Sequence, residues 1–444
     1  PNTKLQMLLQ LKEQAEIVIV ISAQDIISSK VRGDYGITYD LDVLRLIDAF
    51  QEMGLYVGSV CVTKYTAAAE VEAFEKRLSS LGIRTFRHYK IPGYPNDVAR
   101  IVSDEGYGKN DYIETQRPLV VITAPGPGSG KMATCLSQLY HEHKRGVKAG
   151  YAKFETFPIW NLPLGHPVNV AYEAATADLK DVNKVDNFHL EAYGKMAVNY
   201  NRDIEVFPVV RSILTKISGT EFVYHSPTDM GVNMAGYCIV DDDVCCEASK
   251  QEVIRRYFKA LVDYKNGTAK PSTVHRLEFL MSGLGISPAD RKVAAAARAK
   301  SEQNDGCGAV AIELDDGRTV TGKNTEMMSA SAACVFNAVK VLAGIDDAVK
   351  LISPYVIGPI LDLKTKILNE RENPLTLEEA LLALSICAAT DPNAAKAVEQ
   401  LPKLRETEAH STHMLIKADE NPFRKLGVNL TCDPEFLDNH LYSN

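Results

Sequence analysis

The stretch Leu119–Lys131, LVVITAPGPGSGK, passes from an apolar run into glycine-rich backbone and ends at a lysine. Its first five residues are leucine or β-branched, which is typical of a buried strand. A helical pattern begins near Met132, so the glycines stand between a strand and the N-terminus of a helix. Such a turn aims several free backbone N–H groups and the helix N-terminus at one point, where an anion fits.

We call residues 124–131 the glycine turn and expect it to hold a phosphate group. Its glycines can adopt positive φ and let a ligand approach the backbone, and its lysine supplies a full positive charge. The predicted phosphate-binding residues are Gly126, Gly128, Ser129, Gly130 and Lys131. The alternative is a tight strand–helix connection that binds no ligand.

The glycine turn departs twice from the pattern G-x-x-x-x-G-K-[ST] of nucleotide-binding loops. Pro125 occupies the first glycine position, and Met132 replaces the hydroxyl residue that would coordinate magnesium. The run Tyr237–Asp241 is apolar and ends in carboxylates, as a second metal-binding motif would. Asp241, Asp242 and Asp243 are better interpreted as an N-terminal cap for the helix that follows. A magnesium requirement is therefore left open.

The residues around the glycine turn alternate β-rich runs with helical patterns, which predicts a doubly wound, mostly parallel sheet. This P-loop-like α/β domain is expected to span residues 1–150. Its predicted strands are Ile17–Ser22, Leu55–Thr63, Arg84–Tyr89 and Leu119–Thr123. Its predicted helices are Asp40–Met53 and Ala67–Leu81.

Two further domains are expected, because 444 residues exceed what one hydrophobic core usually organises. Residues 151–285 predict a mostly helical middle region, best marked by a helix at Asp243–Tyr264 that Gly267 closes. Residues 286–444 predict an α/β domain that opens at Ser287. Its predicted strands are Ala309–Leu314, Thr319–Thr321, Val349–Ile352 and Thr412–Ile416, and its helices are Ser329–Leu342, Thr376–Ala389 and Pro392–Leu401.

Composition excludes several classes of protein. The net charge of −8 and the lack of long Lys and Arg clusters argue against a nucleic-acid partner. Nine cysteines without a C-x-x-C pair predict reduced thiols in a cytoplasmic protein, and no apolar run is long enough to span a membrane. The chain starts at Pro1, which suggests that an N-terminal segment is missing. We expect a homo-oligomer.

Three motifs carry a resemblance to a known family: TAPGPGSGK at 123–131, GYAKFETFP at 150–158 and SPTDMGVNM at 226–234. Over the whole chain the sequence resembles a bacterial family of conserved hypothetical proteins of unknown function. Some members have been labelled ATP-dependent zinc proteases, but a zincin needs H-E-x-x-H on one helix face, and this sequence has none. The resemblance implies an architecture and no activity.

The C-terminal domain also resembles the cytidine deaminase fold, on the order helix, strand, turn, strand, helix and the segment Gly322–Glu326, GKNTE. That likeness implies that Asn324 and Glu326 contact a ribose. The alternative is a loop with a carboxylate at the helix entry. The cysteine and histidine ligands that would hold the catalytic zinc are missing from the corresponding positions, so neither zinc nor deamination is expected.

The loop-rich stretch 151–200 mixes aromatic residues with polar ones, as ligand pockets do. Lys153 and Glu155 are the candidates here for a second ligand contact, although packing between helices would explain the same residues.

The function expected from the sequence is binding of a nucleotide or another phosphorylated small molecule, with phosphoryl transfer or hydrolysis as the natural chemistry. No metal ligand is identified. The alternative is a non-catalytic, oligomeric ligand-binding protein with a zinc-less deaminase-like domain.

Overall fold

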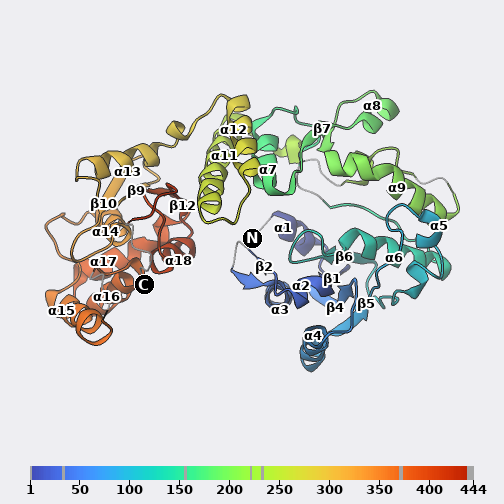
Figure 1. Cartoon of the computed structure of the whole chain (residues 1–444), viewed down its shortest axis with the longest axis horizontal. Helices are drawn as coiled ribbons and strands as arrows, with labels where there is room; N and C mark the ends of the chain where they lie inside the picture. Colours follow the sequence, from blue (N-terminus) through green and yellow to red (C-terminus); the bar gives the residue numbers. More distant parts are fainter. Residues whose placement is uncertain are drawn as a thin grey trace. The chain divides into compact units, whose positions relative to one another are not determined.

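The computed structural model describes residues 3–32, 36–154, 158–220, 223–231, 235–369 and 374–437. The chain forms two compact units, each built from two separate segments (Figure 1). The first unit comprises Pro1–Leu162 and Lys184–Tyr237, and the second comprises Pro163–Asn183 and Cys238–Asn444. Within the described ranges, no helix has both the length and the apolar character needed to cross a membrane.

A parallel four-stranded sheet forms the centre of the first unit, in the order β5-β4-β1-β6. Its strands are β1 (Ala15–Ser22), β4 (Tyr56–Thr63), β5 (Arg84–Arg87) and β6 (Leu119–Thr123). Every residue of β1 is buried, as expected for the central strand of a sheet that is covered on both faces. The α/β class and the four strands predicted from the sequence are confirmed, and β6 has the predicted bounds.

The two faces of this sheet pack against different helices. Ile17, Ile19 and Ile21 of β1 pack in one cluster with α3 (Tyr39–Glu52) and α4 (Ala69–Ser80). Val18 and Val20 face the other side, where Ile113 joins them. Gln138 of α6 (Lys131–Lys144) donates to the Ile113 carbonyl over 3.0 Å, which fixes α6 on this second face.

The first unit contains further short elements. The hairpin of β2 (Val31–Arg32) and β3 (Ile37–Thr38) was not predicted from the sequence. The other elements are α1 (Thr3–Gln10), α2 (Ala23–Ile27), α5 (Val98–Ile101), η1 (Tyr107–Lys109), β7 (Asn183–Val185), α8 (Asn187–Tyr193), β8 (Val198–Tyr200), α9 (Asn201–Ser218), α10 (Pro227–Met230) and η3 (Ala235–Cys238).

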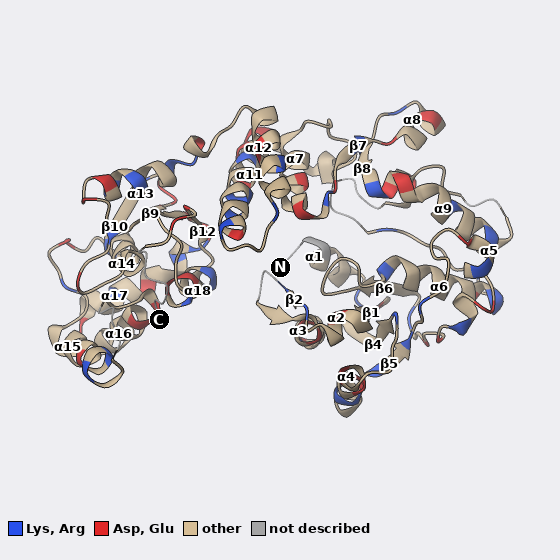
Figure 2. Ribbon diagram, in the orientation of Figure 1, with Lys and Arg blue, Asp and Glu red and all other residues tan. Residues whose placement is uncertain are grey.

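A helical group opens the second unit, formed by α7 (Pro167–Ala175), α11 (Asp242–Lys265) and α12 (Pro271–Leu284). Val170 and Ala174 of α7 share an apolar cluster with Val253 and Ile254 of α11. The helix predicted at 243–264 is confirmed, since α11 spans Asp242–Lys265. Figure 2 shows residues of both charge signs along α11, where Glu252 pairs with two arginines on the following turn. The predicted middle region, 151–285, is shared between the two units.

A second four-stranded sheet has the order β10-β9-β11-β12, with β9 antiparallel to both of its neighbours. Its strands are β9 (Ala309–Glu313), β10 (Thr319–Lys323), β11 (Glu408–Ser411) and β12 (Asn429–Cys432). The core beside this sheet includes residues of α14 (Ala330–Ala343). Ser329 caps the start of this helix, because its side chain accepts a hydrogen bond from the Ala332 amide. The helical elements around this sheet are η4 (Pro288–Asp290), α13 (Lys292–Glu302), α14 (Ala330–Ala343), α15 (Pro354–Asp362), η5 (Leu363–Ile367), α16 (Leu377–Ala388), α17 (Pro392–Gln400), η6 (Leu401–Leu404) and α18 (Lys417–Leu426), whereas η2 (Ala177–Leu179) packs with the helical group.

Two predicted strands of this region were wrong. Residues 349–352 form no strand, because Leu351 and Ile352 bury their side chains from irregular backbone beside α14 and α16. The strand predicted at 412–416 lies four residues earlier, as β11, whose residues 408–411 pair with β9 and β12. The sequence analysis also missed β12.

Candidate functional site

The order of the first sheet determines where a ligand would bind. The chain passes from β1 outward to β4 and β5, and then returns to the other side of β1 to form β6. In open parallel sheets, ligands bind beyond the carboxyl ends of the strands at the point where the order reverses. That point lies between β1 and β6. The glycine turn follows β6 directly, so it lies at the edge where this rule places a ligand.

The glycines of the turn have different roles. Gly128 and Gly130 adopt φ of +80° and +95°, in the left-handed region that favours glycine. A Cβ at Gly126 would lie 2.2 Å from Tyr39 Oη, whereas a Cβ at Gly128 would meet nothing within 4 Å. Gly126 is therefore required by packing, and Gly128 leaves open space above the backbone.

Hydrogen bonds hold the turn by its carbonyl groups. Thr63 Oγ1, at the end of β4, donates to the Ser129 carbonyl over 2.7 Å, and Ser129 Oγ donates to the Gly126 carbonyl over 3.1 Å. In the part of the chain that the structure describes, the amides of Gly126, Gly128, Ser129 and Gly130 have no hydrogen-bond partner. Thr63 and Ser129 thus fix the shape of the turn through its carbonyl groups.

Lys131, the first residue of α6, folds its side chain back over the turn. Its Nζ donates to the Gly126 carbonyl over 3.1 Å, which places the ammonium group beside the glycines. Cys135 lies one helical turn further, where burial raises the pKa of its thiol to about 12. The Cys135 thiol is therefore neutral at physiological pH and is not an activated nucleophile.

A second cation, Lys30, lies against Tyr39, the residue that packs on Gly126. The Lys30 ammonium lies 4.7 Å from the centre of the Tyr39 ring, whose hydroxyl end packs against Gly126. Lys30 Nζ also lies 3.5 Å from Asp25 Oδ1. Sequence reasoning missed Lys30 and Tyr39, because they are far from the glycines in sequence and belong to no motif.

The other predicted contact of the first unit is engaged within the protein. Lys153 forms an ion pair with Asp203 of α9, and its amide donates to the Met230 carbonyl. The charge of Lys153 is therefore balanced by a carboxylate. Glu155, predicted with it, lies outside the described residues.

Asn324 and Glu326 belong to the second unit, after β10. Asn324 Oδ1 accepts a 2.6 Å bond from the amide of Ala330, so this side chain satisfies the start of α14. The side chain of Glu326 is exposed to solvent. This geometry accounts for Asn324 by local structure and agrees with the alternative interpretation of a loop at a helix entry.

The three aspartates at the start of α11 do not act alike. Asp241 accepts from the Val244 amide over 3.1 Å and is the predicted helix cap. Asp242 instead contacts His166 and Cys246. Burial, followed by the neighbouring Asp242 carboxylate, raises the pKa of the Cys246 thiol. Sequence reasoning missed this cluster, since the four-residue spacing of Asp242 and Cys246 was the only local signal and His166 is 76 residues from Asp242.

Known proteins match this chain over its full length. Models described as "Domain of unknown function DUF1846" match residues 1–285 (N-terminal) and 289–442 (C-terminal). A protein named "UPF0371 protein" from Clostridium botulinum (strain Langeland / NCTC 10281 / Type F) is 54% identical over 450 residues, covering 100% of this chain and 90% of the relative. A protein of the same name from Clostridium tetani (strain Massachusetts / E88) is 53% identical over 450 residues, with the same coverage. The predicted likeness to a family of unknown function is confirmed: the chain belongs to the DUF1846 family.

Proposed function

We propose that the glycine turn binds the phosphate group of a small molecule, a nucleotide or another phosphorylated metabolite. The observation that carries this proposal is the set of four backbone amides, at Gly126, Gly128, Ser129 and Gly130, that have no partner among the described residues. Unpaired N–H groups are costly unless water or a ligand satisfies them. A tetrahedral oxyanion accepts several such bonds at once.

Two neighbouring features favour an anion over a neutral ligand. The turn opens the 14-residue helix α6, whose N-terminus carries partial positive charge. Lys131 adds a full charge at the same place, and it can exchange its bond to the Gly126 carbonyl for a stronger one to a phosphate oxygen. If chemistry follows binding, positioned donors and a lysine suit phosphoryl transfer or hydrolysis, since they stabilise charge on the phosphoryl oxygens.

The experiment is a thermal unfolding screen with inorganic phosphate, pyrophosphate and ATP, each with and without magnesium. A ligand at one hundred times its Kd stabilises the native state by about 2.7 kcal/mol and so raises Tm. We expect a rise that needs no magnesium, because Met132 offers no hydroxyl to the ion. Lys131→Ala should reduce it. Lys144→Ala, at the other end of α6, should not.

Two results would contradict the proposal. One is an unchanged Tm in the presence of all three anions. The other is an equal rise in the wild type and in Lys131→Ala, which would place the anion elsewhere on the surface.

A second proposal concerns the C-terminal region, which we infer to be related to the deaminase fold without its zinc. Its support is the hairpin of β9 and β10 between α13 and α14, within the order β10-β9-β11-β12. On this view the protein is a non-catalytic oligomer that senses a ligand such as a nucleoside. Sedimentation separates the two functions, because a nucleoside-dependent change in assembly would persist in Lys131→Ala.

A further inference from the structure

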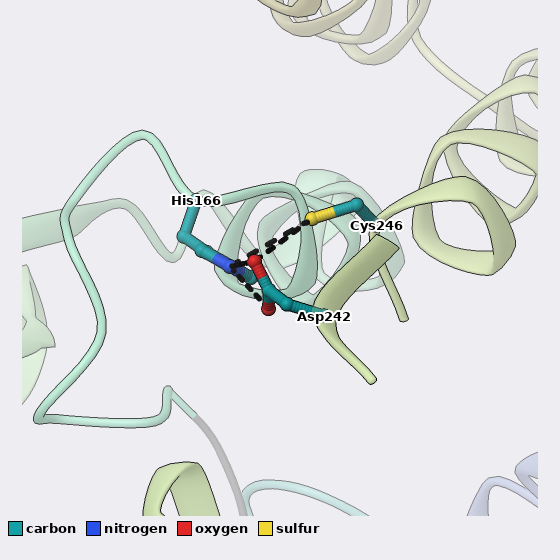
Figure 3. A group of neighbouring side chains, drawn as sticks. All are labelled: His166, Asp242 and Cys246. Carbon is teal, nitrogen blue, oxygen red and sulfur yellow. Dashed lines mark hydrogen bonds and ion pairs between the residues drawn. The ribbon is translucent and has the colours of Figure 1, made fainter. Parts of the chain in front are cut away.

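A cluster of three different metal-binding side chains lies at the start of two packed helices of the second unit. His166 precedes the first residue of α7, and Asp242 and Cys246 lie one turn apart at the start of α11. Figure 3 shows the three side chains pointing toward one another. Among the described residues, these three form a group of His, Cys and Asp side chains whose ligand atoms lie close enough together to hold one ion.

The distances within this cluster fit a single ion. His166 Nε2 lies 3.0 Å and 3.3 Å from the two Asp242 oxygens, and Cys246 Sγ lies 3.8 Å from His166 Nε2 and 3.7 Å from Asp242 Oδ2. A tetrahedral zinc ion, with bonds of about 2.0–2.3 Å, separates its nitrogen, oxygen and sulfur ligands by roughly 3.3–3.6 Å. Shifts of a few tenths of an ångström would complete the coordination.

Packing already holds the three ligands together. Ala171 and Ala174 of α7 lie in the same apolar cluster as Val253 and Phe258 of α11, so the two helices pack against each other. Asp242 and Cys246 share one face of α11 through their four-residue spacing. An ion would therefore join two helices that already pack together.

Without an ion, a hydrogen bond of 3.0 Å joins His166 Nε2 to Asp242 Oδ1, and the contacts of the Cys246 sulfur are longer. The Cys246 thiol lies beside a carboxylate, and a dication would replace the thiol proton and neutralise both groups. His166 Nδ1 accepts from the Val168 amide at 3.3 Å, a long bond. To bind a metal through Nε2, the imidazole would carry its proton on Nδ1 and give up that bond, which caps the start of α7, so ion binding would have to offset the loss of the cap.

We propose that His166, Asp242 and Cys246 bind one divalent transition metal ion of the zinc class, with a fourth position open to water or substrate. Nitrogen, oxygen and sulfur ligands together suit zinc, and three protein ligands with an open position are typical of catalytic rather than structural zinc sites. This proposal departs from the absence of zinc expected from the sequence, which rested only on missing motifs. It does not depend on phosphate binding by the glycine turn.

The test measures metal binding directly. Protein freed of metal with a chelator is titrated with Co²⁺, whose charge-transfer absorption reports a thiolate ligand, and with Zn²⁺ in competition with a chromophoric chelator. We expect one ion per chain with a thiolate band. Cys246→Ser should abolish the band and weaken Zn²⁺ binding by more than the roughly 10–100-fold that loss of an outer partner costs.

Cys245→Ser is the matched control, because it removes the adjacent thiol of the same helix and should leave both readouts unchanged. Asp242→Asn is a second variant in case Cys246→Ser does not fold, as checked by circular dichroism, and it should also weaken Zn²⁺ binding. The proposal is overturned if the wild type binds no stoichiometric ion or shows no thiolate band. It is equally overturned if the band survives in Cys246→Ser or disappears in Cys245→Ser.

Discussion

Acid should destabilise the first unit through one buried histidine. His88 follows β5, is 4% exposed, and its Nε2 lies 3.1 Å from the Asp111 carbonyl. Burial lowers the pKa of His88 from 6.5 to about 4, although the Asp111 carbonyl partly opposes this effect. The imidazole is therefore neutral in the native state at pH values where the unfolded chain takes up a proton.

The sign and the size of the effect follow from proton linkage. Between pH 6.5 and about 4 the unfolded state binds more protons at this position than the native state, so the free energy of unfolding falls as the pH falls. Each pKa unit corresponds to about 1.4 kcal/mol, which sets the full loss from His88 at about 3 kcal/mol. The loss begins near pH 6.5 and is complete near pH 4.

Urea unfolding followed by tryptophan fluorescence measures this loss. The single tryptophan, Trp160, lies in the same unit as His88. His88→Gln keeps a donor for the Asp111 carbonyl but does not titrate. Between about pH 7 and about pH 4.5 this variant should lose about 2.5 kcal/mol less than the wild type. The exposed His225 gives the control His225→Gln, which should behave as the wild type. Equal acid losses in His88→Gln and the wild type would refute the reasoning.

Three other predictions follow from individual contacts. Burial also lowers the pKa of His413, in the second unit, to about 4. The protection of the β11 amides from hydrogen exchange should therefore fall as the pH falls below 6.5, and His413→Gln should remove this effect. Gly128→Ala should cost about 1–2 kcal/mol through backbone strain alone, whereas Gly130→Ala should cost more in urea unfolding, since its Cβ would also lie 3.0 Å from Thr63. Arg291→Met should lower the free energy of unfolding of the second unit by about 3–5 kcal/mol, because the buried guanidinium donates to the Glu408 carboxylate and to the Ala409 and Asn429 carbonyls, which would lose these bonds together. Urea unfolding followed by circular dichroism measures the loss, and an unchanged urea midpoint would contradict this prediction.

The fold of the first unit could be predicted from the sequence where burial and periodicity agree. β1 and β6 are continuous apolar runs between helical patterns, and their positions were predicted to within two residues. The hairpin of β2 and β3 was not, because two residues in each strand give no period to recognise. At 349–352 an apolar run indicated burial correctly, but burial of Leu351 and Ile352 does not require a strand. β11 starts at a charged residue, Glu408. Its partner Arg291 is distant in sequence, so no local pattern marked the start of this strand.

The candidate site could be predicted only in its local part. Positive φ at Gly128 and Gly130 follows from residue type and spacing, and the sequence identified both glycines. The packing of Tyr39 on Gly126, the approach of Lys30 and the contact of His166 with Asp242 depend on tertiary structure. None of these contacts leaves a trace at a fixed spacing along the chain.

The most direct measurement of the central claim is a titration of protein labelled with ¹⁵N at glycine, using inorganic pyrophosphate. The amide signals of Gly126, Gly128 and Gly130 should shift together and saturate, while those of Gly267 and Gly427, in the second unit, should stay in place. The same titration of Lys131→Ala should require more pyrophosphate. If the three signals do not move, or if glycine signals throughout the chain shift to the same extent, the glycine turn is not a phosphate site.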